Sequence, residues 1–444
     1  MMHTFKGGMH ITDSKAYTNK LPIQTMSAGD LLYYPLQQHV GVMLSPVVSV
    51  GDSVKIGQLI ADSDAFISAP IHASVSGTVK DIGLYPHPSG VKMQSIVIEN
   101  DHQDTVDPSV QPMDDYFNYT HDQLIKIIRD AGIVGMGGAG FPTHVKLSPP
   151  PDKKIDYVIV NGAECEPYLT SDHRVMLETP DDIIYGLKTL MYILGLKSGY
   201  IGIEVNKQDA IETLRKHIDE DEYKQINIVP LKTKYPQGSE KHLIKAITKR
   251  SVPSGGLPAD VGAIVVNIDT CAAITRKLKT GMPLIRRIVT ISGDAISTPK
   301  NVSVPIGVPF KELIENAGGF SQEPKKIIMG GPMMGMAQHN LDTPVVKGTS
   351  ALLCLTTDVS LFDTTGNCIR CSRCVSACPM RLAPLFLKKN VLAENYEECE
   401  RYNIMDCLEC GLCSYVCPSR QHPLQYIRMG KAQITENKRR GGQK

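Results

Sequence analysis

Cysteines near the end of the chain stand at a spacing that suits iron–sulfur chemistry. Nine of the twelve cysteines follow residue 365, and two runs among them, "CIRCSRCVSACP" and "CLECGLCSYVCP", share the pattern C-x2-C-x2-C-x3-C-P. Thiolates at this spacing bind [4Fe–4S] clusters, and the fourth cysteine of each run ligates the cluster of the other run. The sequence therefore predicts two clusters with crossed ligands. One is held by Cys368, Cys371, Cys374 and Cys417, and the other by Cys407, Cys410, Cys413 and Cys378.

A pair of structural zinc ribbons is the alternative for these cysteines. Zinc sites usually pair two C-x2-C units across a longer insert, whereas here two consecutive triads are each followed by Cys-Pro. Iron–sulfur ligation is therefore the better interpretation. The isolated cysteines are interpreted as packed or surface thiols; they are Cys165, Cys271, Cys354 and Cys399. Because such clusters move electrons one at a time, the rest of the chain is expected to hold a donor or an acceptor.

A glycine-rich stretch, "GIVGMGGAGFPTHVK", occupies residues 132–146. Its glycines allow the backbone to approach a ligand closely; they are Gly135, Gly137, Gly138 and Gly140. The dinucleotide fingerprint follows a strand and opens a long helix. Here a helical pattern at 121–132 precedes the glycines, and Pro142 and Pro149 leave room for only a short helix after them. A ligand loop and a tight connection between elements both stay open at this point.

Polar residues follow two predicted strands in the middle of the chain. Strands and helices alternate between residues 155 and 278, which predicts an α/β domain. The polar residues are Asn161, Glu164 and Glu166 after the first strand, and Asn267, Asp269 and Thr270 after the second. Ligands gather at the carboxyl ends of strands in open α/β sheets, although acidic residues on a loop are often only solvated.

The remaining segments have the features of smaller units. Residues 38–100 alternate short apolar stretches with turns and resemble the barrel-sandwich fold of biotinyl and lipoyl carriers. The hairpin that would carry the cofactor lysine has the sequence "DSDAFISAP", so we interpret this unit as a scaffold. Residues 99–115 are polar, as in a linker, and residues 284–348 predict a small α+β module. The basic end of the chain, residues 431–444, is expected to be mobile.

Length and charge limit the class of protein. The chain has 444 residues with 47 Lys+Arg and 46 Asp+Glu. Its length predicts several domains, and its balanced charge gives no reason to expect nucleic acid as a partner. No apolar run approaches the ~18 residues of a membrane-spanning helix, and the first residues lack the apolar core of a signal peptide. We therefore expect a cytoplasmic protein, and docking onto a membrane complex stays open.

Several segments together resemble one family. "FKGGMH", "SAPIHASVSGTV", "GMGGAGFPTHVK", "VNGAECEP" and "ISGDA", followed by the two cysteine runs, resemble the C subunits of the Rnf complex, the membrane-bound ferredoxin:NAD+ oxidoreductase. The α/β and α+β units are also similar to the flavoprotein subunit of respiratory complex I.

The resemblance implies a multidomain α/β and α+β protein. Its units are an N-terminal segment and barrel-sandwich hybrid over 1–112, an FMN/NADH-binding α/β domain over 113–281, a β-grasp-like SLBB module over 282–350, a helical ferredoxin domain with two [4Fe–4S] clusters over 351–430, and the basic mobile tail over 431–444.

The resemblance also implies ligands for the α/β domain. FMN is expected in the loop from Gly135 to Gly140, with NAD(H) stacked on its open face. Contacts with the flavin phosphate, ribityl chain or ring are then expected from Lys146, Asn161, Asn267 and Thr270.

On the nicotinamide side, the expected residues are Glu164 and Glu166, with Phe141 stacking on the dinucleotide. The segment "YPQGSEK" takes the place of the complex I loop that closes over the nucleotide, which gives Gly238 and Glu240 candidate roles. Complex I has two consecutive acidic residues after that glycine, where this chain has Ser239 and Glu240.

The expected function is electron transfer between NAD(H), FMN and two [4Fe–4S] clusters in an Rnf-type complex whose other subunits couple it to ion transport. Catalysis is assigned to FMN, which the protein positions and tunes. Expected partners are the integral membrane subunits and a ferredoxin-like iron–sulfur subunit, with the chain peripheral on the cytoplasmic face of the membrane. Two alternatives are a cobalamin reductase of the microcompartment type, in which the glycine-rich domain comes first, and a flavin-free electron-transfer scaffold.

Overall fold

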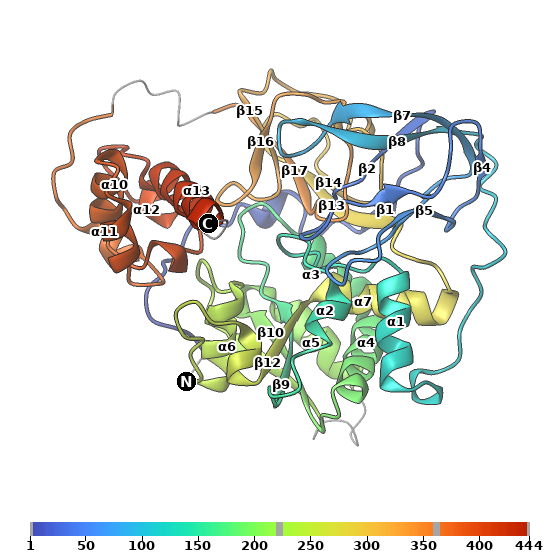
Figure 1. Ribbon diagram of the computed structural model, residues 1–444, viewed down its shortest axis with the longest axis horizontal. Helices are drawn as coiled ribbons and strands as arrows, with labels where there is room; N and C mark the ends of the chain where they lie inside the picture. Colours follow the sequence, from blue (N-terminus) through green and yellow to red (C-terminus); the bar gives the residue numbers. More distant parts are fainter. Residues whose placement is uncertain (1–2, 219–224, 358–364, 442–444) are drawn as a thin grey trace.

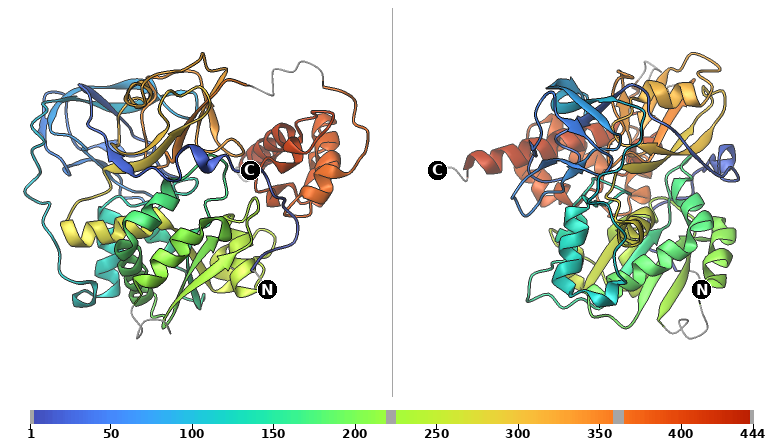
Figure 2. Two further views of the ribbon diagram at one scale, coloured as in Figure 1. Left: turned by 180° about the vertical axis from the view of Figure 1, so that it is seen from behind. Right: turned by 90° about the vertical axis from the view of Figure 1, so that its right-hand side faces the viewer.

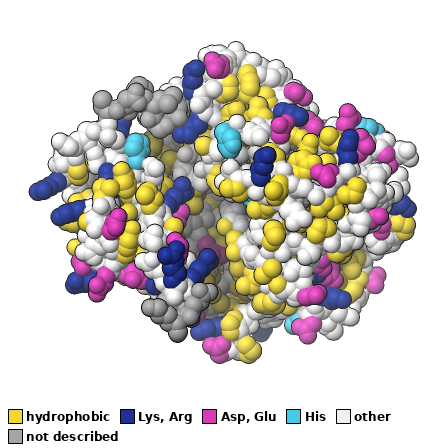
Figure 3. Space-filling view, turned by 45° about the horizontal axis from the view of Figure 1, so that its top comes forward, with side chains coloured by type: hydrophobic (Ala, Val, Ile, Leu, Met, Phe, Trp, Pro, Cys, Tyr) yellow, Lys and Arg dark blue, Asp and Glu magenta, His cyan; other side chains and the backbone are white. Residues whose placement is uncertain are grey.

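The structure, a computed structural model, describes residues 3–218, 225–357 and 365–441. Figure 1 shows the α/β domain on one side, two sheet-rich units packed above it, and a compact group of C-terminal helices beside both. The two views in Figure 2 show the same arrangement. In the space-filling view of Figure 3, the C-terminal helices form a lobe that faces the sheets across a hollow. No helix in the described ranges combines the length with the apolar character that spanning a bilayer requires.

Two small sheets form the N-terminal barrel-sandwich. The larger has the order β2 (Leu31–Pro35), β8 (Lys92–Asn100), β7 (Gly77–Pro86), β4 (Ser53–Val54), and the smaller has the order β3 (Ser45–Pro46), β5 (Leu59–Asp62), β6 (Ile71–His72). Side chains on successive strand residues point to opposite faces. Leu32, Ile60 and Ile96 consequently face inward and are fully buried.

A parallel four-stranded sheet forms the centre of the α/β domain. Its order is β11 (Ile226–Leu231), β10 (Gly199–Glu204), β9 (Tyr157–Gly162), β12 (Ala263–Asn267). The helices of this domain are α1 (His121–Asp130), α2 (Thr143–Lys146), α3 (Ser171–Glu178), α4 (Pro180–Ile193), α5 (Gln208–Lys216), α6 (Glu240–Thr248) and α7 (Ile268–Thr280).

The helices of the α/β domain cover both faces of its sheet. Val158 and Val160 of β9 are buried in the large core that includes α4, α5 and α7. Ile159, on the opposite face of the same strand, is buried in a separate cluster with Leu243 of α6. The single turn of α2 at the end of the glycine-rich stretch agrees with the short helix that the prolines predicted.

The third unit is a six-stranded mixed sheet with one helix, α8 (Phe310–Asn316). Its order is β1 (Ile23–Thr25), β14 (Lys300–Pro305), β13 (Arg286–Ser292), β17 (Ala351–Leu355), β15 (Lys326–Met329), β16 (Met336–Gln338). Two of its strands fall outside the range 282–350 that we expected. β1 comes from the N-terminal segment and pairs in parallel with β14, and β17 pairs with β13 and β15. The sheet therefore takes strands from distant parts of the chain.

The C-terminal helices are α9 (Arg373–Ala377), α10 (Pro384–Leu392), α11 (Tyr396–Arg401), α12 (Leu412–Tyr415) and α13 (Pro423–Gly441). The boundary that we expected at residue 430 does not exist, because α13 continues through most of the supposed tail. Ile427 and Ile434 lie one heptad apart on α13, and both are buried in the core of these helices, which explains the helix. Residues 442–444 lie outside the described residues.

Short 3-10 helices connect these elements; they are η1 (Lys15–Tyr17), η2 (Tyr116–Asn118), η3 (Val205–Lys207), η5 (Pro258–Val261) and η7 (Ile404–Asp406).

The first three units share one continuous hydrophobic core, and a buried lysine joins them. The Nζ atom of Lys347, which lies just before β17, donates to the carbonyl oxygens of Pro70 in the barrel-sandwich and Gly132 in the α/β domain. Desolvation by burial lowers the pKa of Lys347 to about 7. The C-terminal helices have a core of their own, so they are held to the rest of the molecule by a smaller set of contacts, described below.

Candidate functional site

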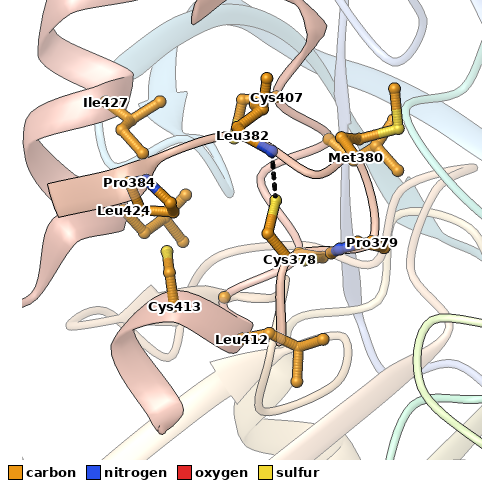
Figure 4. A pocket seen from close by; sticks show the side chains of 13 residues that line it. Cys378, Pro379, Met380, Leu382, Pro384, Cys407, Leu412, Cys413, Leu424 and Ile427 are labelled. Atoms are coloured by element: carbon orange, nitrogen blue, oxygen red, sulfur yellow. Dashed lines mark hydrogen bonds between the residues drawn. The ribbon is translucent and has the colours of Figure 1, made fainter. Parts of the chain in front are cut away.

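Four cysteines from two separate runs line one cavity among the C-terminal helices (Figure 4). They are Cys407, Cys410 and Cys413 of the second run and Cys378 of the first. Leu382, Leu412, Leu424 and Ile427 complete an apolar lining. The structure thus brings together the crossed ligand set predicted for the second cluster.

Backbone amides and burial determine the environment of these thiols. The amides of Leu382 and Glu409 donate to the sulfur atoms of Cys378 and Cys407, each at 3.4 Å. Desolvation by burial raises the pKa of Cys410 to about 11 and that of Cys413 to about 12. Buried thiolates need a compensating cation, and a metal that they coordinate provides one. The donor set therefore fits an iron–sulfur cluster. Within residues 3–218, 225–357 and 365–441, no three His, Cys, Asp or Glu side chains converge where one metal ion would sit.

The ligands predicted for the first cluster lie nearer the surface. Cys368 and Cys371 are exposed, and Cys374 and Cys417 are half-buried. Burial raises the pKa of Cys374, and the nearby Cys417 raises it further. Burial lowers the pKa of Lys388, while Cys417 and Cys368 act in the opposite direction. The charge of Cys417 thus acts on Cys374 of the first run and on Lys388 beside it, and its ligation of the first cluster stays a prediction.

The glycine-rich loop of the α/β domain has an open tip. Gly135 donates its amide to the carbonyl of Phe141 at 2.9 Å, which closes the base of the loop. Gly137 and Gly138 are exposed at the tip. A Cβ atom at Gly137 would lie 2.7 Å from Nδ2 of Asn267, whereas one at Gly138 would meet nothing within 4 Å. The loop therefore needs glycine at 137 for its own packing, and at 138 it offers bare backbone to a ligand.

Two asparagines stand in register at the carboxyl edge of the parallel sheet. Asn161 of β9 pairs with Asn267 of β12. Oδ1 of Asn267 caps α7 by accepting from the amides of Asp269 and Thr270 at 2.9 and 3.3 Å, and its Nδ2 donates to Asp172 at 2.7 Å. Nδ2 of Asn161 donates to the carbonyl of Gly238 at 2.8 Å. The strands thus place both asparagines beside the glycine-rich loop and the YPQGSEK segment.

Thr270 lies behind the glycine-rich loop. Its hydroxyl donates to the carbonyl of Val134 at 3.0 Å and accepts from the amide of Met136 at 2.9 Å. The residue is fully buried. The hydroxyl of Thr270 therefore holds the loop, and its contact with the flavin stays a prediction.

Lys146 and Glu240 form an ion pair near this edge. The Nζ atom of Lys146 lies 2.8 Å from Oε1 of Glu240 and donates to the carbonyl of Val265 at 3.0 Å. Both side chains are partly exposed, so they can change partners when an anion arrives. Phe141 at the base of the loop is half-buried.

The acidic loop after β9 is turned inward. Oε1 of Glu164 accepts from the amide of Asp172 at 2.7 Å. Oε1 of Glu166 accepts from the hydroxyl of Tyr235 at 3.1 Å, and its Oε2 accepts from the amide of Met333 at 3.1 Å. Both carboxylates thus accept from protein donors and help to hold the loop. A role of Glu164 and Glu166 on the nicotinamide side stays a prediction.

Lys15, from the N-terminal segment, stabilises this acidic loop through hydrogen bonds to its backbone. Its Nζ donates to the carbonyl oxygens of Glu164 and Glu166 at 2.9 and 3.0 Å and also to that of Leu169. Sequence reasoning missed Lys15, because it lies about 150 residues before its partners and no local pattern marks it.

Sequence reasoning also missed the buried charges behind the asparagines. Desolvation by burial raises the pKa of Asp172 to about 8, and Glu164 and Asp269 raise it further. Asp269 forms ion pairs with Arg276 and with the buried Arg287. The only local signal for Asp172 is its position in the first turn of a helix that directly follows the acidic loop.

These features fit FMN. The bare tip at Gly138, the polar groups of Asn161 and Asn267, and the cation Lys146 lie at one sheet edge, where a phosphate and a polar ring system can be bound.

Models of four protein families match successive parts of the chain. They are described as the RnfC barrel sandwich hybrid domain (residues 3–103), the Nuo51 FMN-binding domain (128–276), the SLBB domain (288–337) and the 4Fe-4S dicluster domain (367–420). These matches confirm the predicted fold class and the predicted cofactor domains for FMN and two clusters.

Characterised relatives are similar over nearly the whole length. The C subunit of the proton-translocating ferredoxin:NAD(+) oxidoreductase complex of Clostridium ljungdahlii is 52% identical over 434 residues, which cover 98% of this chain and 94% of the relative. The C subunit of the Na(+)-translocating complex of Acetobacterium woodii is 47% identical over 438 residues, which cover 99% and 98%.

A solved structure has a similar fold at low identity. The NAD+-reducing [NiFe]-hydrogenase in the H2-reduced state superposes with a TM-score of 0.51 and 16% identity over 75% of this chain and 69% of that one. This likeness concerns the fold alone. The full-length relatives decide the family: the chain belongs to the C subunits of ion-translocating ferredoxin:NAD(+) oxidoreductase complexes, the Rnf family.

Proposed function

We propose that this protein exchanges a hydride with NAD(H) at an FMN group on the α/β domain and exchanges single electrons through its two clusters. Bound FMN would supply the conversion between two-electron and one-electron chemistry. The main support is that the second-cluster cavity adjoins the flavin domain. Cys410 and Leu412 of the cavity belong to one hydrophobic cluster with Tyr235, and Tyr235 donates to Glu166 of the acidic loop.

The loop tip and the sheet edge hold FMN in this proposal. Gly138 provides backbone without a side chain, and Asn161 and Asn267 provide polar groups in register. Lys146 exchanges its ion pair with Glu240 for a phosphate, a pairing favoured by opposite charge. Since burial raises the pKa of Asp172 to about 8, its carboxyl group is mostly protonated at neutral pH. The loop therefore has less negative charge behind it when an anion binds.

The first cluster exchanges electrons with a partner protein in this proposal. Its ligands Cys368 and Cys371 are exposed, and the intervening Ile369 is 67% exposed. Because Cys410 of the second-cluster cavity shares a hydrophobic cluster with Tyr235 of the flavin domain, we put the second cluster between the flavin and the first cluster in the order of transfer. Electrons therefore pass between the flavin, the second cluster, the first cluster and then a partner, or in the reverse order.

The partners are other subunits of the complex. We propose a ferredoxin-like iron–sulfur protein at the first cluster and integral membrane subunits that hold this chain peripherally on the cytoplasmic face and couple electron transfer to ion movement. The names of the relatives, which describe ion-translocating complexes, support this arrangement. The full-length relatives and the FMN-domain match favour it over a cobalamin reductase and over a flavin-free scaffold.

Cofactor analysis tests the proposal directly. Anaerobically purified protein is expected to contain iron and sulfide for two [4Fe–4S] clusters and one FMN per chain. NADH is expected to bleach the flavin absorption first and to produce cluster signals in electron paramagnetic resonance afterwards. Zinc in place of iron, or clusters that NADH reduces without any flavin, would overturn it.

A further inference from the structure

The N-terminal segment crosses from the α/β domain to the second-cluster site. We call residues 3–11 the strap; Figure 1 shows it running from the N-terminus near α6 past the C-terminal helices. On the α/β side, His3 forms a bridge with Leu231 at the end of β11. Met9 pairs with Tyr235 through two backbone hydrogen bonds, of 3.0 and 2.8 Å. The strap thus extends the edge of the flavin domain.

The opposite side of the strap contacts the turn that carries Cys378. The amide of Gly8 donates to the carbonyl of Ala377 at 3.2 Å. A Cβ atom at Gly7 would lie 2.9 Å from the carbonyl oxygen of Cys378 and 3.0 Å from Cα of Pro379. The strap backbone therefore touches the crossing ligand of the second cluster with no side chain between them.

Two glycines make this double contact possible. Gly7 and Gly8 have φ angles of +83° and +66°, in the left-handed region. A Cβ atom at Gly8 would lie 2.5 Å from the carbonyl oxygen of Tyr235. A side chain at either position would push the strap away from the Cys378 turn or from Tyr235. The pair of glycines therefore fixes how closely Tyr235 and Cys378 approach one another across the strap.

Side chains reinforce the strap on both sides. The Nζ atom of Lys234 donates to the carbonyl oxygens of Phe5 and Gly7 at 2.5 and 2.8 Å and lies 3.7 Å from the centre of the Phe5 ring. The Phe5 ring lies 4.2 Å from that of His242, and Nε2 of His242 is 3.1 Å from the carbonyl oxygen of Pro379. Phe5 and His242 therefore form a continuous series of contacts between Lys234 and the Cys378–Pro379 turn.

We propose that the strap fixes the position of the Cys378 turn, and with it the second cluster, relative to the flavin domain. The C-terminal helices have a separate core, so their position depends on such contacts. Because electron-transfer rates fall steeply with distance, the strap then controls the flavin-to-cluster rate, a consequence that rests on the proposed function. Gly7, Gly8 and Lys234 are positioning residues in this scheme.

The chain offers matched controls for the two glycines. Gly195, with a φ of +64°, and Gly51, with a φ of +95°, have similar backbones, but a Cβ atom at either would meet nothing within 4 Å. Comparison of Gly8→Ala with Gly195→Ala, and of Gly7→Ala with Gly51→Ala, therefore separates the collision from the backbone strain that all four variants share.

The experiment follows flavin and clusters separately in the holoprotein. After anaerobic mixing with NADH, we expect Gly7→Ala and Gly8→Ala to bleach the flavin at the wild-type rate but to reduce the clusters about tenfold more slowly or worse, the scale on which small displacements of reacting groups act. Iron and FMN contents are expected to match those of the control variants, which should keep the wild-type rate at both steps. Lys234→Met, which leaves the cluster ligands and both glycines untouched, is expected to show the same split.

Amide hydrogen exchange supplies a readout that needs no electron transfer. Peptides that cover residues 3–11, 230–240 and 374–382 are expected to exchange faster in the strap variants than in the controls. The proposal would be overturned if Gly8→Ala and Lys234→Met exchanged their amides and reduced their clusters at the wild-type rates. Faster amide exchange without any change in the rate of cluster reduction would also overturn it. If NADH reduced no cluster in the wild-type protein, the proposed function would be overturned instead. The positioning role would then be tested by amide exchange alone, and unchanged exchange in the variants would refute it.

Discussion

The hydroxyl of Tyr235 donates a hydrogen bond to Oε1 of Glu166 at 3.1 Å, at the point where three parts of the molecule meet. Tyr235 is 1% exposed and shares a hydrophobic cluster with Cys410 of the second-cluster cavity. The other oxygen of Glu166 accepts from Met333 of the third unit. Desolvation by burial raises the pKa of Glu166 to about 7, and the bonds from Met333 and Tyr235 oppose this rise. The acidic loop, the third unit and the cluster domain are therefore connected through two side chains.

Tyr235→Phe is expected to destabilise the protein mainly above pH 7. The variant leaves the buried Glu166 carboxylate with one donor fewer, which costs about 1–2 kcal/mol. Below the pKa of about 7 the carboxyl group of Glu166 is protonated, and the lost bond matters less. Thermal unfolding at pH 6 and pH 8 measures this difference. Tyr17→Phe, at a residue that is 44% exposed, is the control; an equal loss at both pH values in Tyr235→Phe would contradict the explanation.

Asp172→Asn is expected to stabilise the protein at alkaline pH. Burial raises the pKa of Asp172 in the folded protein to about 8, far above the ~3.9 of an unfolded aspartate. Between these values the folded state binds more protons, so wild-type stability falls as pH rises, by up to about 1.4 kcal/mol per pH unit.

The asparagine variant lacks that loss, while its amide oxygen can still accept from Asn267. Thermal unfolding of both proteins from pH 6 to pH 9 measures the difference in their free energies of unfolding. This difference should widen towards pH 8 and stay constant at higher pH. A gap that does not depend on pH would assign the effect to packing instead of charge.

Sequence patterns predicted those parts of the site in which the chemistry is local. The spacing of three residues within each cysteine run predicts three ligands of one cluster, and the repeat of the run predicts the crossing ligand. The structure places Cys378 in one cavity with the cysteines of the second run. Asn161 and Asn267 were found because parallel strands bring their carboxyl ends to one edge. Their register pairing in the structure shows why this inference works.

The residues that sequence patterns missed act over long separations or from a face that no pattern defines. Lys15 acts on a loop about 150 residues away, and Asp172 obtains its raised pKa from burial and from charges on other elements. Thr270 was identified as a residue near the site, but the sequence does not tell on which side of the loop its hydroxyl lies. Residues 431–444 were expected to form a mobile tail because most of them are polar or basic. The pattern contains one large apolar residue, Ile434, and it is buried on the inner face of α13.

Gly138→Ala is expected to weaken FMN binding without affecting the fold. A Cβ atom at this position meets no protein atom within 4 Å, so the free protein has room for it. In the complex with FMN, the same Cβ atom would collide with the bound flavin. We expect affinity to fall by at least about tenfold, or ~1.4 kcal/mol, in a fluorescence titration of flavin-stripped protein.

Gly137→Ala is the contrasting variant. Its Cβ atom would lie 2.7 Å from Nδ2 of Asn267, so it should lower both the FMN affinity and the unfolding temperature of the flavin-free protein. Wild-type FMN affinity in Gly138→Ala would show that the flavin does not lie against the loop tip.

Cys378→Ala tests the crossed ligand scheme. Cys378 belongs to the first run in sequence but lines the cavity of Cys407, Cys410 and Cys413, so its loss should damage the second cluster and leave the first intact. Iron per chain is then expected to fall from about eight to about four atoms, with one set of cluster signals remaining. Cys399→Ala is the control, because Cys399 also lies close in sequence to the runs but is buried in the helical core, and its iron content should match the wild type. If Cys378→Ala instead removed the signals of the first cluster, the crossed scheme would be wrong, and each run would bind its own cluster with its four cysteines.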